Sequence, residues 1–560
     1  MSANRQSVPQ KTRRVVSDPG VLLIGPYDPH CGEYTFLAPP LGVWRLAGVL
    51  ESAGVRVEVF DPNCCEGPPG KALESILRHG RWEVVGVSTT GMTLRYDLEL
   101  AHIARQVNPG ATILAGGMEA TFKPDLMFRI GPFDLVVLGE GEKPLLEIVD
   151  RLRTGEPLKF ISGTAERAPG GGVNRNHQHA LTRDELRDAI LKTPYEKMPY
   201  GAYWEKLEAA YRVGALPSKA DREARLGEIR SVRLITLNYC PMGCTFCSST
   251  NFLHAAQGSV ASIARLDPAE CVTMMKRIVA AHPDVRTIIF QDDIFVFTKD
   301  HRILPLCDAI VAAKAAGDLP QELKFISTNR IDAMNPERLA AMRRAGFRVL
   351  GFGVENFSLG VLKEFNKPQI FKHIEPVLQE ALDLGITPFL DLILTSPRCS
   401  LSDFAETIRK SYKWLLAGCE MGMYPYVIPF SGAPMANDPE LKPHTSYVRR
   451  RIQGTAIEWE QPSKILPLDP VARAVILAVE QKFELWLRYL ESRVAHLPSR
   501  VRSLIWIICA IPYLIDADEE APDRNEAMEQ LLLRLPGMDG AAREHLRQFD
   551  APATKLAVNQ

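Results

Sequence analysis

Two stretches in which short apolar runs alternate with helical stripes constrain the fold of this chain most. The first stretch extends from Val21 to about Arg153, and its short runs are rich in β-branched residues. Between the runs, apolar residues recur with helical spacing, as in Val43, Leu46 and Leu50. This alternation predicts an α/β fold with a doubly wound, Rossmann-like sheet of five parallel strands. The predicted strands begin at Val21, Val55, Val84, Ala111 and Leu135.

A second alternating stretch begins at Val232 and contains six strand-like runs with helical stripes between them. This pattern predicts a partial (β/α)6 TIM-like barrel. Beyond about residue 440 helical patterns dominate, so we expect a helical C-terminal region. The predicted barrel strands are residues 232–237, 287–291, 323–327, 349–354, 386–394 and 423–429.

The two alternating stretches and the weaker patterns around them divide the chain into five regions. A polar N-terminal segment without periodicity is expected to be disordered, and the segment between the two alternating stretches is expected to be a linker with some helix. The regions are the disordered N-terminus at 1–19, the doubly wound domain at 20–154, the linker at 155–228, the barrel at 229–440 and the helical region at 441–560.

Charge and cysteine content exclude several classes of function. The chain has 66 Lys and Arg against 67 Asp and Glu, and this balance argues against a nucleic-acid partner. The first residues lack the apolar segment of a secretory signal, and the 11 cysteines suggest no disulfide framework, so we expect a cytoplasmic protein. The apolar run 504–515 is too short to cross a bilayer and contains Pro512, which predicts a core helix or a substrate wall and no transmembrane segment.

Three cysteines share one loop directly after the first predicted barrel strand. Cys240, Cys244 and Cys247 follow a Cx3Cx2C spacing. Three thiolates can hold a four-iron cluster and leave one iron open to a small molecule, whereas a structural zinc normally takes four protein ligands. The sequence therefore favours an open iron–sulfur cluster. The alternative is a zinc knuckle in which His254 supplies the fourth ligand.

The cysteine spacing, with Phe246 just before the third cysteine, resembles the signature of radical S-adenosyl-L-methionine (SAM) enzymes. The resemblance implies a [4Fe-4S] cluster whose open iron binds SAM. It further implies that one electron, from a donor such as flavodoxin or ferredoxin, cleaves SAM to a 5'-deoxyadenosyl radical that abstracts hydrogen from a small-molecule substrate. No general base is required for that step, and we assign no catalytic side chain.

The resemblance also implies a SAM site at the carboxyl ends of the barrel strands, where reactive groups of α/β barrels gather. Asp292 and Asp293 would hold the SAM ammonium, although either Asp could instead cap the next helix. Arg330 would bind the SAM carboxylate and Glu355 the ribose, or these two residues could pair with each other as a structural ion pair. The residues implied to contact SAM are Phe246, Asp292, Asp293, Thr328, Asn329, Arg330, Glu355, Ser396 and Pro429.

The last two predicted barrel strands match the family pattern unequally. Many members carry a glycine-rich Ile-x-Gly-x-x-Glu type of sequence on the fifth strand, whereas this chain has Leu-Thr-Ser-Pro at 394–397, so Ser396 departs from that pattern. Pro429 and the Gly-Ala-Pro that follows it resemble the usual end of the sixth strand. Tyr424 and Tyr426 could line the barrel mouth, but aromatic residues on a strand more often belong to the core.

The predicted strands of the first domain end in glycines and small polar residues, which lets a bulky cofactor approach the backbone. No GxGxxG follows the first strand, which disfavours a dinucleotide. Such a domain before a radical SAM barrel resembles the cobalamin-binding domain of cobalamin-dependent radical SAM enzymes. The residues implied to contact cobalamin are Pro40, Leu41, Gly42, Ser88, Thr89, Thr90, Gly116, Gly117, Glu119, Gly139 and Glu140.

His30 lies in Asp-Pro-His-Cys-Gly at 28–32, which is one residue shorter than the Asp-x-His-x-x-Gly sequence that supplies the lower axial histidine in many cobalamin domains. His30 is therefore either the lower cobalt ligand or a solvated loop histidine, and the shortened loop favours the second.

Three functions follow from these resemblances. The first is a cobalamin-dependent methyltransferase that moves a methyl group from methylcobalamin to an unactivated carbon of a natural-product or lipid-like substrate. The second is an oxidative cyclase or ring-rearranging enzyme similar to the anaerobic porphyrin-ring cyclase. The third is a non-catalytic corrinoid or SAM sensor.

Overall fold

A computed structural model of the chain describes residues 15–29, 38–179, 181–216, 218–259, 263–492, 497–514, 520–535, 543, 544 and 546. The described residues divide into two compact units. The first unit comprises Met1–Tyr203, Ser248–Arg265 and Arg449–Glu460, and the second comprises Trp204–Cys247, Leu266–Val448 and Gln461–Gln560. His30 and residues 1–14 of the N-terminus predicted to be disordered lie outside the described residues.

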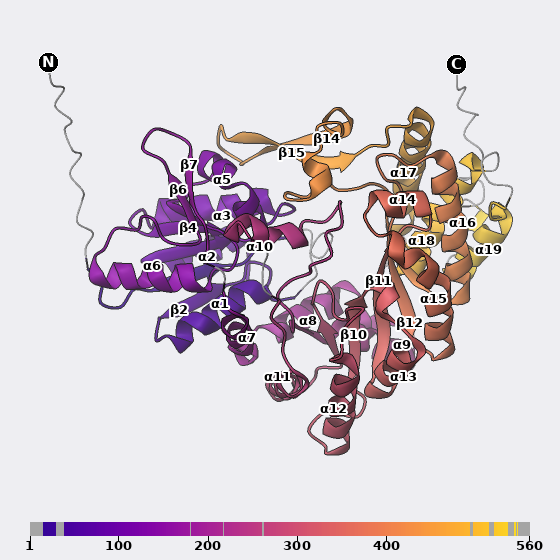
Figure 1. Cartoon of the computed structure of the whole chain (residues 1–560), viewed down its shortest axis with the longest axis horizontal. Coiled ribbons are helices and arrows are strands. Elements are labelled where there is room, and N and C mark those ends of the chain that lie inside the picture. Colours follow the sequence, from indigo (N-terminus) through magenta and orange to yellow (C-terminus); the bar gives the residue numbers. More distant parts are fainter. Residues whose placement is uncertain are drawn as a thin grey trace. The chain divides into compact units, whose positions relative to one another are not determined.

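The first unit contains a seven-stranded sheet in the order β2-β1-β3-β4-β5-β6-β7. Figure 1 labels β2, β4, β6 and β7 of this sheet. Its strands are β1 Val21–Ile24, β2 Val57–Phe60, β3 Val84–Ser88, β4 Thr112–Gly116, β5 Leu135–Val137, β6 Thr164–Arg167 and β7 Val173–Asn176. The first five are parallel, which confirms the predicted parallel sheet. The two antiparallel strands β6 and β7 were not predicted, because four-residue polar strands leave almost no periodic signal.

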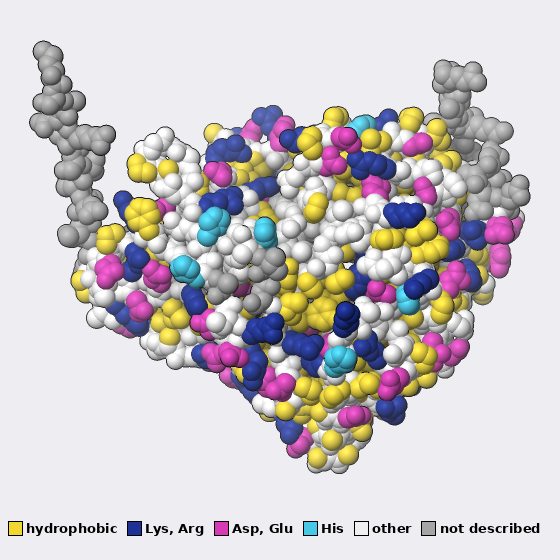
Figure 2. Space-filling view, in the orientation of Figure 1, with side chains coloured by type: hydrophobic (Ala, Val, Ile, Leu, Met, Phe, Trp, Pro, Cys, Tyr) yellow, Lys and Arg dark blue, Asp and Glu magenta, His cyan; other side chains and the backbone are white. Residues whose placement is uncertain are grey.

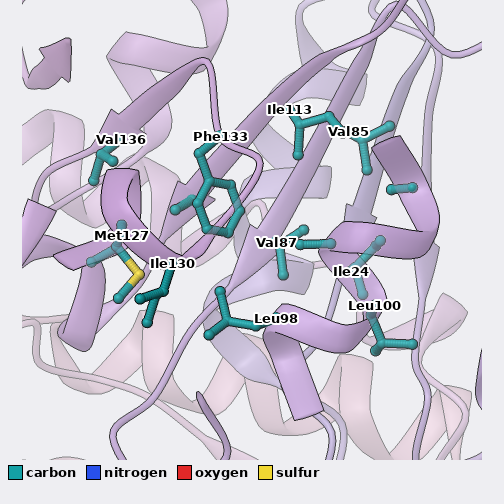
Figure 3. Close-up of a cluster of buried hydrophobic side chains, with 14 of the residues drawn as sticks. Ile24, Val85, Val87, Leu98, Leu100, Ile113, Met127, Ile130, Phe133 and Val136 are labelled. Carbon is teal, nitrogen blue, oxygen red and sulfur yellow. The ribbon is translucent and has the colours of Figure 1, made fainter. Parts of the chain in front are cut away.

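Both faces of the first sheet carry a hydrophobic core because successive strand residues point to opposite sides. On β1, Val21 and Leu23 lie in one core, and Leu22 and Ile24 lie in the other. The core of Val21 is closed by α1 Leu41–Ser52 and α6 Glu142–Thr154. The core of Leu22, part of which Figure 3 shows, is closed by α2 Pro69–His79, α3 Leu94–Val107 and α5 Pro124–Ile130.

Short helices follow and interrupt this sheet, and some of them lie in the segment predicted as a linker with some helix. One begins with a capping box, in which Thr182 accepts a hydrogen bond from the Glu185 N–H and the Glu185 carboxylate accepts one from the Thr182 N–H. These helices are α4 Met118–Phe122, α7 Arg183–Leu191, α8 Tyr200–Ala210, α9 Lys219–Ile229 and α10 Ser249–Gln257.

The second unit contains a six-stranded sheet in the order β13-β12-β11-β10-β9-β8, and every neighbouring pair is parallel. This sheet of six parallel strands agrees with the predicted partial (β/α)6 TIM-like barrel. Its last strand lies earlier in the chain than the predicted 423–429. The strands are β8 Ser231–Leu234, β9 Thr287–Phe290, β10 Lys324–Asn329, β11 Phe347–Glu355, β12 Thr387–Ile393 and β13 Glu420–Tyr424.

Helices connect the parallel strands of the second sheet, and packed aromatic rings lie against it. Phe290 stacks on Phe347 with ring centroids 5.7 Å apart, and Phe295 lies 4.1 Å from Phe290. The six connecting helices are α11 Pro268–Ala281, α12 Ile303–Ala315, α13 Pro336–Ala345, α14 Leu359–Glu364, α15 Ile374–Asp383 and α16 Leu401–Ala417.

The C-terminal region contains the predicted helices and one hairpin that was not predicted. The helices are α17 Pro470–Glu491, α18 Ser499–Ala510 and α19 Arg524–Leu533, and the hairpin is β14 Thr445–Arg451 with β15 Glu458–Ile465. Leu504 and the residues after it in α18 are buried, which matches the expected core helix. Within the described ranges, none of the helices has both the length and the apolar character that a bilayer crossing requires.

Charges of both signs are interspersed over the face of the molecule that Figure 2 shows. This mixture agrees with the formal net charge of −1.

Candidate active site

The three cysteines lie on a loop that begins six residues after β8 and that a distant segment of the same unit holds in place. The Thr245 N–H donates to the carbonyl of Phe365 (3.3 Å), and the Thr245 hydroxyl donates to the carbonyl of Glu364 (2.8 Å). The Asn366 side chain donates to the carbonyl of Gly243 (3.1 Å). The rings of Phe246 and Phe365 pack edge to face with centroids 4.9 Å apart. The 364–366 segment therefore fixes the path of the cysteine loop.

The loop turns at Gly243, whose φ of +66° falls in the left-handed region that favours glycine. The turn leaves all three thiols partly exposed. Burial raises the pKa of Cys240 to about 12, and the charges of Asp293, Cys247 and Cys244 act in the same direction. A thiolate at this position therefore needs a cation beside it, which the irons of a cluster provide.

The chemistry of these donors fits a cluster. Three thiolates can hold a four-iron cluster and leave one iron open, whereas a structural zinc normally takes four protein ligands. A cluster binds its thiolates on different irons and so spaces them farther apart than the ligands of one ion. Three cysteines on one loop, held by a separate segment, suit such a cluster.

Asp292 and Asp293 follow β9, and the structure gives them different surroundings. Asp292 is buried and accepts from the Thr236 N–H (2.6 Å), the Thr236 hydroxyl (2.5 Å) and the Leu237 N–H (2.9 Å). Burial raises the pKa of Asp292 to about 6, although Arg302 and these hydrogen bonds oppose that rise. Asp293 is exposed, and its charge acts on the Cys240 thiol. Of the two residues, only Asp293 is exposed to solvent.

Arg330 and Glu355 do not pair with each other, so the structural alternative considered for them is wrong. Arg330 forms a two-pronged ion pair with Asp332 at 2.8 and 2.9 Å. Glu355 accepts instead from Lys367 at 2.8 Å, and both side chains of this pair are at least 88% buried. The charges of Lys367, Glu355 and Arg330 all act on the Cys244 thiol.

The backbone of Glu355 is in a left-handed conformation, with φ of +63°, at a shift in the register between β11 and β12. A non-glycine residue rarely adopts this conformation unless its surroundings hold it there. The Lys367 ammonium donates both to Glu355 and to the carbonyl of Gly353 (2.7 Å), and it therefore holds the bulge and the carboxylate together.

The other predicted SAM contacts lie at or after strand ends. Thr328 is exposed near the end of β10, and Asn329 is buried and donates to the carbonyl of Ser327 (3.0 Å). Ser396 is buried after β12, and its hydroxyl donates to Glu364 (2.5 Å). Pro429 is buried five residues after β13. Asn329 and Ser396 thus satisfy their polar groups within the protein.

Sequence reasoning missed two residues near this group, Lys367 and Asp391. Burial and the Glu355 charge raise the pKa of Asp391 to about 7, and Lys367 opposes them. Asp391 alternates with buried residues along β12 and thus faces the other side of the sheet from Leu390 and Leu392. A single polar residue in an apolar strand was the available signal for Asp391, whereas nothing in the sequence marked Lys367.

Tyr424 and Tyr426 have opposite environments. Tyr424 is 50% exposed at the end of β13, while Tyr426 is buried with its hydroxyl donating to Glu480 (2.8 Å). Burial, Asp391 and Glu355 raise the pKa of Tyr424. Tyr424 therefore lies beside the charged group described above, and Tyr426 belongs to the core.

The first unit has a cavity of about 270 Å³ at the carboxyl ends of β1, β3, β4 and β5. Apolar residues such as Leu23, Val87, Leu114 and Val137 form most of its wall. Eight of the eleven residues predicted to contact cobalamin line it, namely Pro40, Leu41, Gly42, Ser88, Gly116, Gly117, Gly139 and Glu140.

The remaining three predicted cobalamin contacts do not line the cavity. The Thr89 hydroxyl donates to the carbonyl of Gly116 (2.9 Å), Thr90 shares a hydrogen bond with Thr93 (2.8 Å), and Glu119 pairs with Lys123 (3.0 Å). These side chains support the strand ends around the cavity.

The glycines of the cavity leave room for a ligand. A Cβ at Gly42 or Gly116 would meet no atom within 4 Å, so a side chain at either position would fill open space. Gly117 has φ of +92°, and a Cβ there would lie 2.6 Å from the carbonyl oxygen of Thr89, so this position requires glycine. A corrinoid is much larger than the cavity, which therefore suits an inserted apolar part of such a cofactor.

A buried charged group closes one side of the cavity. Arg45 pairs with Glu142 at 2.7 Å and also with Glu140, and both carboxylates are almost fully buried. Burial raises the pKa of Glu140, and the attraction of Arg45 opposes that rise. Two buried carboxylates that share one guanidinium are held rigidly, which fixes the end of β5 relative to α1.

Asp97 connects the loops that follow two strands of the first sheet. Its carboxylate accepts from the Tyr27 N–H (2.9 Å), the Thr90 N–H (3.3 Å) and the Thr93 hydroxyl (2.7 Å). Burial raises the pKa of Asp97 to about 7, although these hydrogen bonds favour its ionised form. Asp97 thus ties the loops after β1 and β3 to α3.

Comparison with known proteins assigns the part of the chain with the cavity and the part with the cysteine loop to different families. The B12 binding domain family matches residues 29–149, and the radical SAM superfamily matches residues 234–410. A methyltransferase of Pyrococcus horikoshii, itself uncharacterised, is 25% identical over 377 residues, which cover 67% of this chain and 73% of that protein. The anaerobic magnesium-protoporphyrin IX monomethyl ester cyclase of Rubrivivax gelatinosus is 23% identical over 384 residues, covering 67% of this chain and 61% of the cyclase.

Among solved structures, the cobalamin-dependent S-adenosylmethionine radical enzyme OxsB, with aqua-cobalamin bound, has the same fold. The TM-score is 0.63 at 15% identity, and the match covers 92% of this chain and 75% of OxsB. The radical S-adenosylmethionine methyltransferase TsrM of Kitasatospora setae gives a TM-score of 0.60 at 16% identity, covering 88% of this chain and 99% of TsrM.

The B12 binding domain family matches the part of the chain that forms the cavity. The radical SAM superfamily matches the later part that carries the cysteine loop. The chain therefore carries a B12-binding domain followed by a radical SAM domain, which identify a radical SAM enzyme whose expected cofactors are a [4Fe-4S] cluster, SAM and cobalamin.

Proposed function

We propose that this enzyme is a cobalamin-dependent C-methyltransferase that acts on an unactivated carbon of a small molecule of natural-product or lipid-like character. The observation that carries the proposal is the combination of a glycine-lined cavity in the B12-binding domain with an anchored three-cysteine loop in the radical SAM domain. The similarity to proteins named as methyltransferases supports methyl transfer as the outcome.

When bound, the cluster and SAM supply hydrogen-atom abstraction, and cobalamin supplies a transferable methyl group. In this proposal Cys240, Cys244 and Cys247 hold the cluster. Asp293, which is exposed beside Cys240, accepts from the SAM ammonium, and Asp292 positions the strand end on which Asp293 stands.

The proposal assigns the SAM carboxylate to Arg330. Its Nε and Nη2 atoms bind Asp332, and its Nη1 atom has no hydrogen bond from the described residues. Arg330 thus keeps a donor for a second carboxylate. Glu355, held by Lys367, accepts from the ribose hydroxyls, and Phe246, Thr328, Asn329, Ser396 and Pro429 shape the remaining wall.

The cavity residues Pro40, Leu41, Gly42 and Ser88, with the glycines at 116, 117 and 139, would receive an apolar part of cobalamin. Glu140, fixed by Arg45, would offer that part a single polar contact. Thr89, Thr90 and Glu119 would act by supporting the strand ends.

The substrate would contact Asp391 and Tyr424. The Asp391 carboxyl group has no hydrogen bond from the described residues, and Tyr424 is half exposed next to it. A carboxyl group whose pKa is near neutral can accept from, or donate to, a polar substituent of the substrate and so orient the carbon that reacts. We further propose that the enzyme works in the cytoplasm and receives electrons from a small carrier such as flavodoxin or ferredoxin.

The alternative function is oxidative ring closure. It is favoured by the similarity to magnesium-protoporphyrin IX monomethyl ester cyclases of two organisms, in Rubrivivax gelatinosus at 23% identity over 384 residues and in Synechocystis at 23% over 359 residues. A cyclase and a methyltransferase of this class differ in whether SAM donates a methyl group.

Anaerobic reconstitution with iron, sulfide, hydroxocobalamin and SAM tests the proposal. The reconstituted enzyme, a reductant, SAM with a deuterated methyl group and a cell extract are incubated, and products are analysed by mass spectrometry. Methyl transfer predicts 5'-deoxyadenosine, S-adenosylhomocysteine and a new extract compound with a deuterated methyl group. 5'-Deoxyadenosine without S-adenosylhomocysteine favours ring closure, and the absence of any SAM cleavage contradicts both functions.

A further inference from the structure

A second hollow of the first unit, separate in its lining from the glycine-lined cavity, is surrounded by arginines. It has a volume of about 540 Å³ and is lined by Arg95, Arg449, Arg450, Arg451, Gln453 and Gly454. Arg95 stands in the first turn of α3, and the other five residues form the tip of the β14–β15 hairpin.

The hairpin tip is anchored, so its arginines have defined positions in the first unit. Ile452 and Trp459 are 2% and 5% exposed, and both belong to the core that contains Leu22 and Ile24 of β1. Residues 449–460 are part of the same compact unit as α3. Because apolar residues anchor the hairpin tip, its charged side chains can line the hollow.

Three of the four arginines are partly neutralised. Arg449 and Arg451 share the carboxylate of Glu458 across the hairpin, with Arg451 at 3.8 Å, and the Nε of Arg451 also donates to the carbonyl of Thr455 (2.9 Å). Arg95 pairs with Glu99 at 3.3 Å. Two carboxylates therefore face four guanidinium groups.

Arg450 carries the strongest indication of a ligand. It is half-buried, and among the described residues it has no ion pair and no hydrogen bond. Partial burial of a charge without a counterion is unfavourable, and a bound anion would remove that cost. The planar guanidinium group binds phosphate oxygens in a two-pronged manner, which suits several arginines to a phosphate group.

We propose that this hollow binds a small molecule carrying a phosphate or diphosphate group. Its concave shape and a volume within the usual range for small-molecule sites favour such a ligand over an acidic protein, which would need a broader surface. The inference does not depend on whether the enzyme transfers a methyl group. It adds to the protein an anion site with Arg450 at its centre.

Binding of inorganic diphosphate to the full-length protein, measured by isothermal titration calorimetry under anaerobic conditions, tests the proposal. We expect saturable binding of one diphosphate per chain that weakens as salt is raised from 50 to 200 mM. Arg450→Gln should weaken binding about tenfold, the effect of losing one charge-assisted hydrogen bond, and Arg450→Lys should weaken it less. The double change Arg449→Gln with Arg451→Gln should also weaken binding at least tenfold.

The matched control is Arg78→Gln, which removes an exposed arginine that pairs with Glu74 on α2 and should leave diphosphate binding unchanged. Circular dichroism of each variant establishes that it is folded. Equal affinity of the parent and the Arg450→Gln protein, or no saturable binding by the parent, would overturn the proposal. Binding of polyglutamate but not of diphosphate would overturn it as well, in favour of an acidic protein partner.

Cobalamin itself carries a phosphodiester, so the titration is performed with cobalamin-free and cobalamin-loaded protein. Loss of diphosphate binding on loading assigns the hollow to the phosphodiester of cobalamin. Equal binding in both states assigns it to a separate phosphate-bearing ligand. Either result supports phosphate recognition by the arginines and identifies its source.

Discussion

At the scale of single residues, the buried pair of Lys367 and Glu355 is the most constrained feature beside the cysteine loop. Glu355 holds a left-handed backbone conformation, which costs a non-glycine residue roughly 1 kcal/mol or more. The conformation is compensated by the Lys367 ammonium, which binds both the carboxylate and the carbonyl of Gly353. Because this pair acts on the Cys244 thiol, its geometry and the chemistry of the loop are linked.

Replacing Lys367 by methionine should destabilise the protein and impair SAM cleavage together. The change removes one partner of a buried ion pair and leaves the Glu355 carboxylate uncompensated. We expect the free energy of unfolding to fall by about 3 kcal/mol. Urea unfolding of the cluster-free protein measures this loss, and 5'-deoxyadenosine formation by the reconstituted variant measures cleavage.

Lys413→Met is the matched control, because Lys413 pairs with Glu375 where both side chains are exposed, and its removal should cost less than about 1 kcal/mol. Adding Glu355→Gln to Lys367→Met should restore most of the stability but not SAM cleavage. If the double variant is as unstable as the single one, the uncompensated Glu355 charge is not the cause of the lost stability.

Asp391 should make stability depend on pH. Its pKa in the folded protein is about 7, above its usual value, so the folded state binds the proton more tightly than the unfolded state. The resulting stabilisation is complete below about pH 4 and is lost as pH rises through 7. Between pH 5 and pH 8 the parent should therefore lose about 2 kcal/mol more unfolding free energy than the Asp391→Asn variant.

Urea unfolding at pH 5, 6, 7 and 8 measures this difference. Asp308→Asn changes an exposed aspartate on α12 and should leave the pH dependence of the parent intact. Parallel pH curves for the parent and the Asp391→Asn variant would show that Asp391 ionises normally in the folded protein.

At the scale of elements, strand ends and the segments that hold them form both sites. β4 ends at Gly116, in the wall of the apolar cavity, where the backbone is open to a ligand. The cysteine loop after β8 is held by the last residue of α14 and by the two residues that follow it. In each case a parallel strand ends at the edge of the sheet, and a separate element holds the backbone that follows the strand.

Gly116→Leu should remove cobalamin binding without unfolding the first unit. A side chain at Gly116 would project into open space, because no atom lies within 4 Å of the added Cβ, and the three heavy atoms beyond it would fill part of the 270 Å³ cavity. We expect retained cobalamin to fall at least tenfold. The visible absorbance of the corrin after gel filtration measures it.

Gly110→Leu is the control for this change, since its Cβ also meets nothing within 4 Å but lies at an exposed position outside the cavity. It should retain cobalamin like the parent. Iron content should be equal in both variants. A loss of cobalamin from the Gly110→Leu protein would mean that the added leucine lowers cobalamin binding by destabilising the first unit and not by filling the cavity.

At the scale of the whole molecule, the chain consists of two units, and each has its own sheet and its own site. The cavity is lined by residues of the first unit, and the cysteine loop with its holding segment lies in the second. The first sheet is packed by helices of its own unit.

Loss of one cofactor should therefore leave the other site competent. Changing all three of Cys240, Cys244 and Cys247 to alanine should abolish cluster absorbance and 5'-deoxyadenosine formation. The same variant should still bind cobalamin within about twofold of the parent affinity, because no cavity residue is altered. Spectroscopic titration with hydroxocobalamin measures this, and failure to bind would show that the cluster is needed to form the cavity.

How far the sequence predicts the fold can be judged from particular elements. The buried parallel strands β1, β3, β4 and β12 were predicted because runs of apolar residues bounded by glycine or polar residues carry a local signal. The antiparallel β6, β7, β14 and β15 were not, because polar residues such as those of Thr445–Arg451 give no such signal. Their strand character depends on pairing with a neighbour.

The sequence by itself determined the two α/β halves, the cysteine triad and most of the cavity glycines, because each depends on the spacing of nearby residues. Only the tertiary structure decided that Glu355 pairs with Lys367, that Asp292 is buried while Asp293 is exposed, and that an arginine-rich hairpin tip anchors in the first unit. The physical reason is that burial and ion pairing depend on which distant segments meet. Thr245 and Glu364 are hydrogen-bonded neighbours in space but lie 119 positions apart in the sequence, so their contact leaves no trace in local spacing.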